Sequence, residues 1–243
     1  MTEDEQKIQD EAIAFAKKHK HTRCAELTDR SIYPPEESPV SVFMAGSPGA
    51  GKTESAKEII SELEKRQPGA PKVLRIDPDE LRHEFAGYTG ANSWLFQYAT
   101  SIWVDKMHDL ALEHDQTFLL DSTLSNLQRA KGNVQRSLKR NRSVTIWYVY
   151  QSPLVAWEFV QAREEEEGRR IVPERFIDQY FAARDVVNAL KNEFGANIQV
   201  DLLLKPNDQT VKLVQQGIDR IDTHIPERFT RAELEAALGV KRG

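Results

Sequence analysis

The most constraining feature of this 243-residue sequence is the segment from Gly46 to Thr53, which reads GSPGAGKT. It fits the pattern Gly-x4-Gly-Lys-Ser/Thr, in which glycines let successive backbone amides converge on phosphate oxygens. The apolar run Val40 to Ala45 precedes it, and Ala56, Ile59 and Ile60 follow at helical spacing. A strand, this loop and a helix together predict a site for nucleotide phosphates.

The loop also predicts individual roles. Lys52 is expected to reach the β and γ phosphates of ATP and to act in catalysis, and Thr53 is expected to place its hydroxyl on Mg²⁺. A glycine-rich turn that merely joins strand to helix is the alternative. The loop alone does not separate a GTPase, a motor ATPase and a kinase, because all three share it. The predicted nucleotide-binding residues are Gly46, Ser47, Pro48, Gly49, Ala50, Gly51, Lys52 and Thr53.

Further short apolar runs alternate with segments long enough to form helices. This alternation predicts an α/β fold of the P-loop kinase type, a three-layer sandwich with a parallel sheet of about five strands. Residues that directly follow strands should gather at one edge of the sheet, where ligands bind. Besides Val40 to Ala45, the runs are Val73 to Ile76, Phe118 to Leu120, Val144 to Tyr150 and Ile198 to Leu204.

Residues 1–38 are predicted to be a helical N-terminal extension and linker, followed by one domain over 39–243. Glu3 to Lys20 is expected to be a helix, with a shorter helical piece around Arg23 to Thr28. Three prolines between positions 33 and 39 then disfavour both helix and central strand.

Composition limits the possible functions. The formal net charge of −5 argues against a broad surface for nucleic acid and favours a small substrate. Cys24, the only cysteine, cannot form an internal disulfide, which suits a reducing compartment. No apolar run approaches the roughly 20 residues that span a bilayer. We therefore expect a cytoplasmic protein without membrane contact.

Two aspartates follow the second predicted strand, in the segment Ile76-Asp77-Pro78-Asp79. A carboxylate beside the transferring phosphoryl group can take the proton of an attacking hydroxyl. Asp79 is predicted to be this base and to contact the substrate. The alternative for Asp77 and Asp79 is that either caps a helix starting near Glu80.

Asp121, Ser122 and Thr123 follow the third predicted strand. A carboxylate here would help to hold Mg²⁺ or the hydroxyls of a substrate, and Asp121 and Thr123 are predicted to bind substrate. The alternative is that they cap a helix over Asn126 to Arg140.

The segment Arg163 to Pro173 holds four consecutive glutamates between arginines. We interpret it as a mobile lid whose catalytic residues Arg163 and Arg170, seven apart and near one face of a helix, stabilise the transferring phosphoryl group. The alternative is a solvated helix whose charges pair with one another.

Together with Gly90-Ala91-Asn92, these motifs resemble the zeta toxin family of P-loop kinases over roughly Val40 to Leu204. Its members phosphorylate a sugar hydroxyl of UDP-N-acetylglucosamine. The resemblance implies ATP and Mg²⁺ as cofactors, a nucleotide sugar as substrate, Asp79 as base and Asn92 near the substrate. In the best-known members, an acidic residue, a glycine and a threonine lead shortly to an arginine that holds substrate. In this sequence Asp121-Ser122-Thr123 leads instead to Leu124-Ser125, and the next arginine is Arg129.

The resemblance also implies a partner. In the family, a separate antitoxin or an added segment blocks the ATP site with a helix. The hypothesis for this chain is that Glu3 to Lys20 does the same, and the alternative is a helix packed on the outer layer as an ordinary extension.

Two rival functions remain from the sequence. One is a kinase of another small molecule or of a polynucleotide, for which the basic segment Lys131 to Arg142 would be the binding surface. The other is an ATP-dependent switch protein that transfers phosphate only to water.

Overall fold

The structure, a computed structural model, describes residues 1–66, 69–205 and 213–240. Its sheet has the strand order β2-β3-β1-β4-β5-β6. The five strands β1 to β5 are parallel, as the sequence predicts, and β6 is an antiparallel edge strand that the sequence analysis missed. The strands are β1 Val40–Ala45, β2 Leu74–Ile76, β3 Phe118–Leu120, β4 Ser143–Tyr150, β5 Gln199–Leu204 and β6 Leu213–Gln215.

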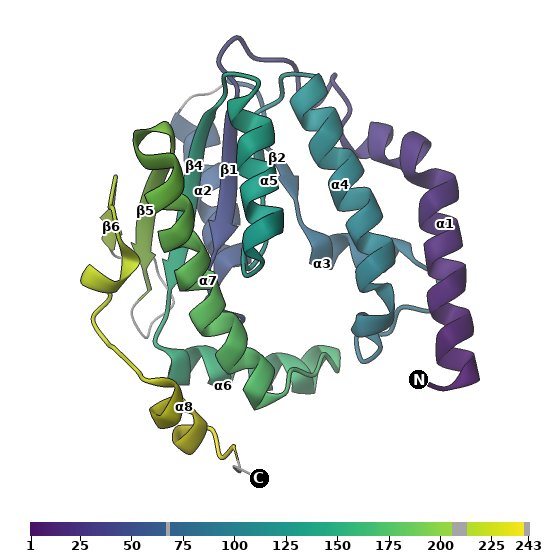
Figure 1. The fold of residues 1–243 in the computed structure, drawn as a ribbon. Coiled ribbons are helices and arrows are strands. Elements are labelled where there is room, and N and C mark those ends of the chain that lie inside the picture. The colour runs from purple at the N-terminus through teal and green to yellow at the C-terminus, as the bar shows by residue number, and fades with distance from the viewer. Residues whose placement is uncertain (67–68, 206–212, 241–243) are drawn as a thin grey trace.

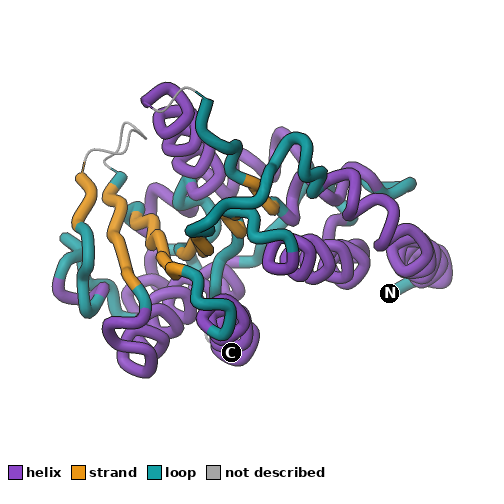
Figure 2. Tube along the Cα trace, turned by 90° about the horizontal axis from the view of Figure 1, so that it is seen from above, coloured by secondary structure: helices purple, strands orange, loops and turns teal. Residues whose placement is uncertain are grey.

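Helices cover both faces of the sheet and confirm the predicted three layers (Figures 1 and 2). Helix α2 lies on one face, and α4, α5 and α7 lie on the other. The α-helices of the described residues are α1 Glu3–Leu27, α2 Lys52–Arg66, α3 Pro78–Leu81, α4 Gln97–Glu113, α5 Leu127–Leu138, α6 Pro153–Glu167, α7 Pro173–Phe194 and α8 Arg231–Ala237.

Strand β1 shows how the sequence builds these layers. Its side chains alternate between the two faces of the sheet. Val42 and Met44 belong to the apolar cluster that includes Ala56 of α2, whereas Phe43 and Ala45 belong to the larger cluster on the other face. Because all four are buried, β1 has the continuous apolar sequence expected of a central parallel strand.

The register of the strands brings the polar segments together. Phe43 of β1 lies opposite Leu120 of β3, and Leu120 lies opposite Ile76 of β2. The amide of Asp121 donates to the carbonyl of Ile76 at 2.9 Å. The segments that begin at Gly46, Asp77 and Asp121 therefore leave the same edge of the sheet.

Helix α1 is continuous from Glu3 to Leu27, so the predicted separate piece around Arg23 is wrong. A capping box of Thr2 and Glu5 starts it, and no glycine or proline interrupts it. It lies beside α4, at the opposite side of the molecule from β6 (Figure 1). Small buried residues such as Ala16 allow this approach, and Trp103 Nε1 donates to the Ala16 carbonyl at 3.0 Å. The predicted division at residue 38 stays a prediction.

Candidate active site

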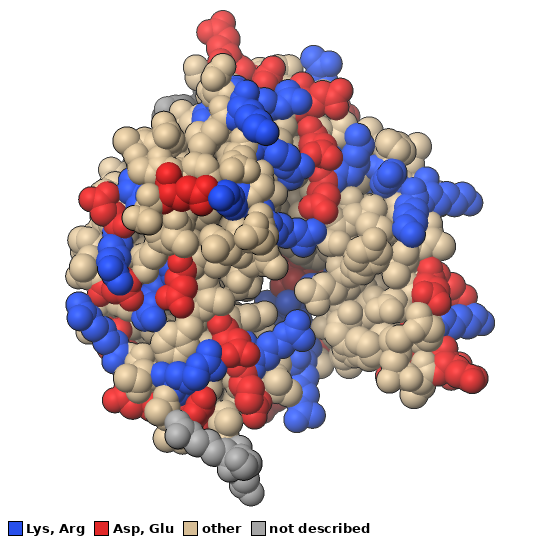
Figure 3. All heavy atoms as spheres, in the orientation of Figure 1, with Lys and Arg blue, Asp and Glu red and all other residues tan. Residues whose placement is uncertain are grey.

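The loop from Gly46 to Thr53 borders a cavity of about 1090 Å³ at the carboxyl edge of the sheet. Figure 3 shows a hollow near the middle of the molecule, with both basic and acidic side chains beside it. Gly49 has φ +71°, and a Cβ there would overlap the carbonyl oxygen of Ala156 in α6. Only glycine therefore lets the loop lie against the backbone of α6.

Lys52 begins α2 and turns back over the loop. Its Nζ donates to the carbonyl of Ser47 at 2.7 Å and to that of Gly46 at 3.1 Å. Burial lowers the pKa of Lys52 to about 8, although the charges of Asp121 and Asp79 act to raise it. Pro48 to Thr53 line the cavity, while the carbonyls of Gly46 and Ser47 accept the hydrogen bonds of Lys52.

Thr53 and Asp121 meet beside the loop, where Thr53 Oγ1 donates to Asp121 Oδ2 at 2.9 Å. Burial and the charge of Asp77 raise the pKa of Asp121 to about 6. Hydroxyl and carboxylate oxygens are the ligands that Mg²⁺ prefers. Within the described residues, no group of three or more His, Cys, Asp or Glu side chains could hold a metal. This donor set fits Mg²⁺, which takes few protein ligands and completes its shell with water and phosphate oxygens.

Asp77 caps α3, as one alternative predicted. Its Oδ1 accepts from the amide of Asp79 at 2.8 Å, and its Oδ2 accepts from Arg75 at 2.5 Å. The same guanidinium lies 3.5 Å from Asp121 Oδ2 and also contacts Glu80. Arg75 therefore holds the two neighbouring strand ends together by bridging their carboxylates.

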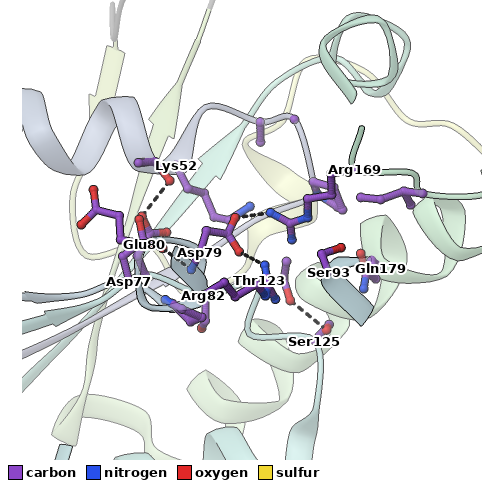
Figure 4. A pocket seen from close by; sticks show the side chains of 18 of the residues that line it. Lys52, Asp77, Asp79, Glu80, Arg82, Ser93, Thr123, Ser125, Arg169 and Gln179 are labelled. Atoms are coloured by element: carbon purple, nitrogen blue, oxygen red, sulfur yellow. Dashed lines mark hydrogen bonds and ion pairs between the residues drawn. The ribbon is translucent and has the colours of Figure 1, made fainter. Parts of the chain in front are cut away.

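Asp79 does not cap a helix, and it lines the cavity. It forms ion pairs with Arg82, with Arg169 and, at 3.4 Å, with Arg163. Burial acts to raise the pKa of Asp79, but the charges of Arg169 and Arg82 outweigh it and lower the pKa to about 2. Figure 4 shows Asp79 between Arg169 and Arg82, with the side chain of Lys52 reaching toward it. One carboxylate thus collects three guanidinium groups next to the phosphate loop.

A model of the Zeta toxin family matches residues 24–218. The chain belongs to the Zeta toxin family. A search among curated proteins found no match in sequence. Among solved structures, the fold is similar to one from a study of the PezAT chromosomal toxin-antitoxin system of the human pathogen Streptococcus pneumoniae. The TM-score is 0.64 at 16% identity, covering 94% of this chain and 88% of that one.

A second similar structure is the complex of AvrRxo1-ORF1 and AvrRxo1-ORF2 with ATP. Its TM-score is 0.54 at 16% identity, and the match covers 87% of this chain and 64% of that one. The same complex with sulphate ions gives a TM-score of 0.55 at 15% identity, covering 86% and 65%. These identities show a shared fold.

The arginines of this Zeta toxin family chain differ from the predicted pair. Arg163 lies 3.4 Å from Asp79, and the other arginine of the predicted lid that contacts Asp79 is Arg169. The predicted contact of Arg163 with phosphates stays a prediction. Arg170 borders the cavity with 75% of its side chain exposed, and it pairs with Glu164 at 3.7 Å. The helix α6 ends at Glu167, and its C-cap residue Gly168 has φ +71°, so the seven-residue helical spacing between Arg163 and Arg170 does not hold.

The two remaining residues predicted to bind substrate, Thr123 and Asn92, differ in whether they line the cavity. Thr123 lines the cavity and its hydroxyl lies 3.0 Å from that of Ser125. Asn92 is not among the lining residues, because both ends of its amide hold its own loop: Oδ1 accepts from the Thr89 amide at 2.9 Å, and Nδ2 donates to the Gly87 carbonyl at 2.8 Å. The predicted substrate contact of Asn92 stays a prediction. The predicted cap role of Asp121 is also absent, since Asn126 caps α5.

Two segments meet beside the cavity. A Cβ at Gly90, which has φ +81°, would overlap the carbonyl oxygen of Glu167 at the end of α6, and one at Gly168 would lie 3.2 Å from the Cβ of Ala91. Ser93, shortly after the first segment, and Arg169, directly after the second, line the cavity. We call this backbone contact between 90–91 and 167–168 the bridge. The charged segment predicted as a lid is thus helical up to Glu167 and rests on the opposite wall.

Some functional residues were missed by the sequence analysis. Arg82 and Arg169 contact Asp79, and Lys205 Nζ donates to the Gly51 carbonyl at 3.0 Å. For Arg82 a signal existed, because it lies one helical turn after Asp79. For Lys205, which follows β5, the position after a strand was the signal.

The predicted alternatives outside the site can also be compared with the structure. No described residue of α1 lines the cavity, so α1 takes the place of an ordinary extension and does not block the site. In the basic segment, Arg142 is buried and donates to Ser41 Oγ at 2.8 Å and the Gln116 carbonyl at 2.5 Å, which is a structural role. No helix of the described ranges is both long and apolar enough to cross a membrane.

Proposed function

We propose that this protein is an ATP- and Mg²⁺-dependent kinase that phosphorylates a hydroxyl of a nucleotide sugar, with UDP-N-acetylglucosamine as the first candidate. The observation that carries the proposal is the position of Asp79, which lies in the same cavity as Lys52 and the Thr53–Asp121 pair. A carboxylate at this place suits an alcohol acceptor, because it can take the proton that the hydroxyl loses.

The arginines around Asp79 can pair either with its carboxylate or with the phosphates of ATP. In the structure they neutralise one carboxylate and lower its pKa to about 2, after burial has acted to raise it. Arg163 and Arg169 can instead turn to the phosphates of ATP, where they stabilise the charge on the transferring group. Asp79 then loses its counter-charges and becomes a stronger base. Thr53 and Asp121 would hold Mg²⁺, which when bound would supply further neutralisation of the phosphate charge.

Family membership supports a role as the toxin of a toxin-antitoxin pair, acting in the cytoplasm and restrained by a separate antitoxin. The neighbouring AvrRxo1-ORF1 complex was solved with ATP, which supports ATP as the phosphoryl donor. Since α1 is held on α4, we propose that any blocking helix comes from another chain.

The proposal is tested by incubating the protein with ATP, Mg²⁺ and UDP-N-acetylglucosamine and searching by mass spectrometry for a product heavier by one phosphoryl group. The Asp79→Asn variant should lose about 10²- to 10⁴-fold in transfer rate while still binding ATP. Steady ATP hydrolysis that no sugar nucleotide accelerates would favour the switch protein. Equal turnover by Asp79→Asn would exclude Asp79 as the base.

A further inference from the structure

Helix α1 packs against the stretch of chain that follows Asp79, although no described residue of α1 lines the cavity. In Figure 1 the chain leaves α3 toward α1 and returns from there to the start of α4. We call residues 82–96 the connecting segment; it includes Gly90 of the bridge. Most of α1 precedes the residues 24–218 that match the family model, so the family match does not account for what this helix does.

The turn that holds Asp79 depends on its neighbours. Helix α3 has only four residues, which is too short to be stable by itself. Asp77 caps its first turn. On the side toward α2, Glu80 pairs with Lys57 at 3.3 Å and also with Arg75. These contacts fix one side of the turn, and the opposite side is fixed by α1.

The contact with α1 is an ion pair with two hydrogen bonds. Glu84 ends the short 3-10 helix that continues α3. Arg23, near the end of α1, donates from Nε to Glu84 Oε2 at 3.1 Å and from Nη2 to Glu84 Oε1 at 2.8 Å. When two nitrogens meet two oxygens in this way, the direction of the carboxylate is fixed as well as its distance.

Apolar packing completes the attachment of the connecting segment. Phe85 is 3% exposed, and its ring centroid lies 6.0 Å from that of Phe15 in α1 and 4.8 Å from that of Trp103 in α4. Farther along, Gln9 Nε2 donates to the Leu95 carbonyl at 3.4 Å. Helix α1 therefore contacts the connecting segment near both of its ends.

The ion pair and the apolar contacts have different effects. The side chains of Arg23 and Glu84 are 37% and 35% exposed, so the pair adds little to the stability of the whole protein. The buried ring of Phe85 supplies that stability instead. What the ion pair adds is a fixed orientation of the turn after Asp79.

We propose that Arg23 is a positioning residue for phosphoryl transfer, which acts through Glu84 on the turn that holds Asp79. This rests on the proposed function, in which Asp79 takes the proton of the acceptor hydroxyl. Arg82, which pairs with Asp79, lies between Asp79 and Glu84 in the chain. Without the ion pair the turn takes up more orientations, and a displacement of about 1 Å at a reacting group can lower a rate by about 10²-fold.

Steady-state kinetics on three variants test this role. Arg23→Gln and Glu84→Gln should each lower kcat by about 10-fold, while the KM for ATP and the melting temperature stay close to those of the unchanged protein. Glu26→Gln is the matched control, because it removes the other carboxylate that Arg23 contacts, at 2.7 Å, and leaves the pair with Glu84. It should change kcat by less than about 2-fold. An equal loss in all three variants would contradict the proposal.

Two combined variants separate positioning from a general structural effect. Arg23→Glu combined with Glu84→Arg exchanges the charges and should recover most of the lost kcat. In an Asp79→Asn background, Arg23→Gln should change the residual rate by less than about 2-fold, because a residue that acts through Asp79 then has no base to position. A loss of about 10-fold in that background would show that Arg23 acts elsewhere, and the proposal would be wrong.

Hydrogen–deuterium exchange of the full chain without substrate tests the ion pair apart from turnover. Arg23→Gln should speed exchange over residues 80–91 by about 5-fold or more and leave the phosphate loop, residues 46–53, unchanged. If exchange is faster but no nucleotide sugar is phosphorylated, the hold of α1 on this segment stands and the proposed function fails. If UDP-N-acetylglucosamine is phosphorylated but neither exchange nor kcat responds to Arg23→Gln, the proposed function stands and the inference is wrong. Failure of both readouts rejects both.

Discussion

The phosphate loop and the Asp79 cluster are two halves of one cavity, and they are built in opposite ways. The loop is a run of eight residues, and Lys52 bonds to carbonyls only five and six positions earlier. Asp79 meets Arg163 and Arg169 from 84 and 90 positions away. The first half is fixed by local backbone geometry, whereas the second exists only when the whole chain has folded. A short motif can therefore predict where nucleotide phosphates bind. The part of the cavity around Asp79, proposed for the phosphoryl acceptor, depends on distant segments.

The largest effect is expected from the local half. Lys52→Ala should lower phosphoryl transfer by about 10³-fold or more, because a preorganised charge on the phosphates is lost. ATP affinity should fall with it, which isothermal titration calorimetry can measure. If Lys52→Ala binds ATP with the affinity of the unchanged protein, Lys52 acts on the transition state alone. The phosphate loop would then not be a separate ATP-binding half of the cavity.

The long-range half is tested by two adjacent arginines. Arg169→Ala should lower kcat by about 10²-fold, because a guanidinium at the transferring group is removed. Arg170→Ala is the matched control and should change kcat by less than about 3-fold, since its side chain is largely exposed and pairs with Glu164. Rapid-quench measurement of single turnovers decides between them, and the reverse order would restore the role predicted for Arg170.

The bridge is tested by two glycines with the same backbone conformation. Gly90 and Gly87 have φ +81° and +80°, but a Cβ at Gly90 meets Glu167, whereas one at Gly87 comes no closer than 3.8 Å to Ile8. Both alanine variants should lose about 1 kcal/mol from backbone strain. Gly90→Ala should lose more and raise the acceptor KM. Thermal unfolding and kinetics on both variants separate strain from the loss of the bridge.

The smallest effect is expected away from both halves, at the contact of α1 with α4. Burial raises the pKa of Cys24 to about 11, against a lesser opposing effect of Lys106, so at pH 8 about 0.1% of the thiol is ionised. Cys24 should react with a thiol reagent such as dithionitrobenzoate only slowly, and ATP should not change that rate. A clear change with ATP would mean that the cavity and α1 move together.

The contrast between local and long-range contacts also explains which features could be predicted from the sequence. Five strands and the loop follow from apolar runs and glycines, which act locally. The strand β6, with three residues, is too short to show a pattern. Arg169 was missed because Gly168, with φ +71°, breaks the helical spacing on which the choice of Arg170 depended. Asn92 was placed near the substrate by the family resemblance, and the sequence does not show that its amide closes a loop.

The bridge ties the end of α6 to the segment before α4. Because glycines at 90 and 168 allow this close approach, the nearby side chains of Ser93 and Arg169 are held on one cavity. If the two segments must separate before a ligand leaves, the rate of their separation would limit turnover however fast the chemical step becomes.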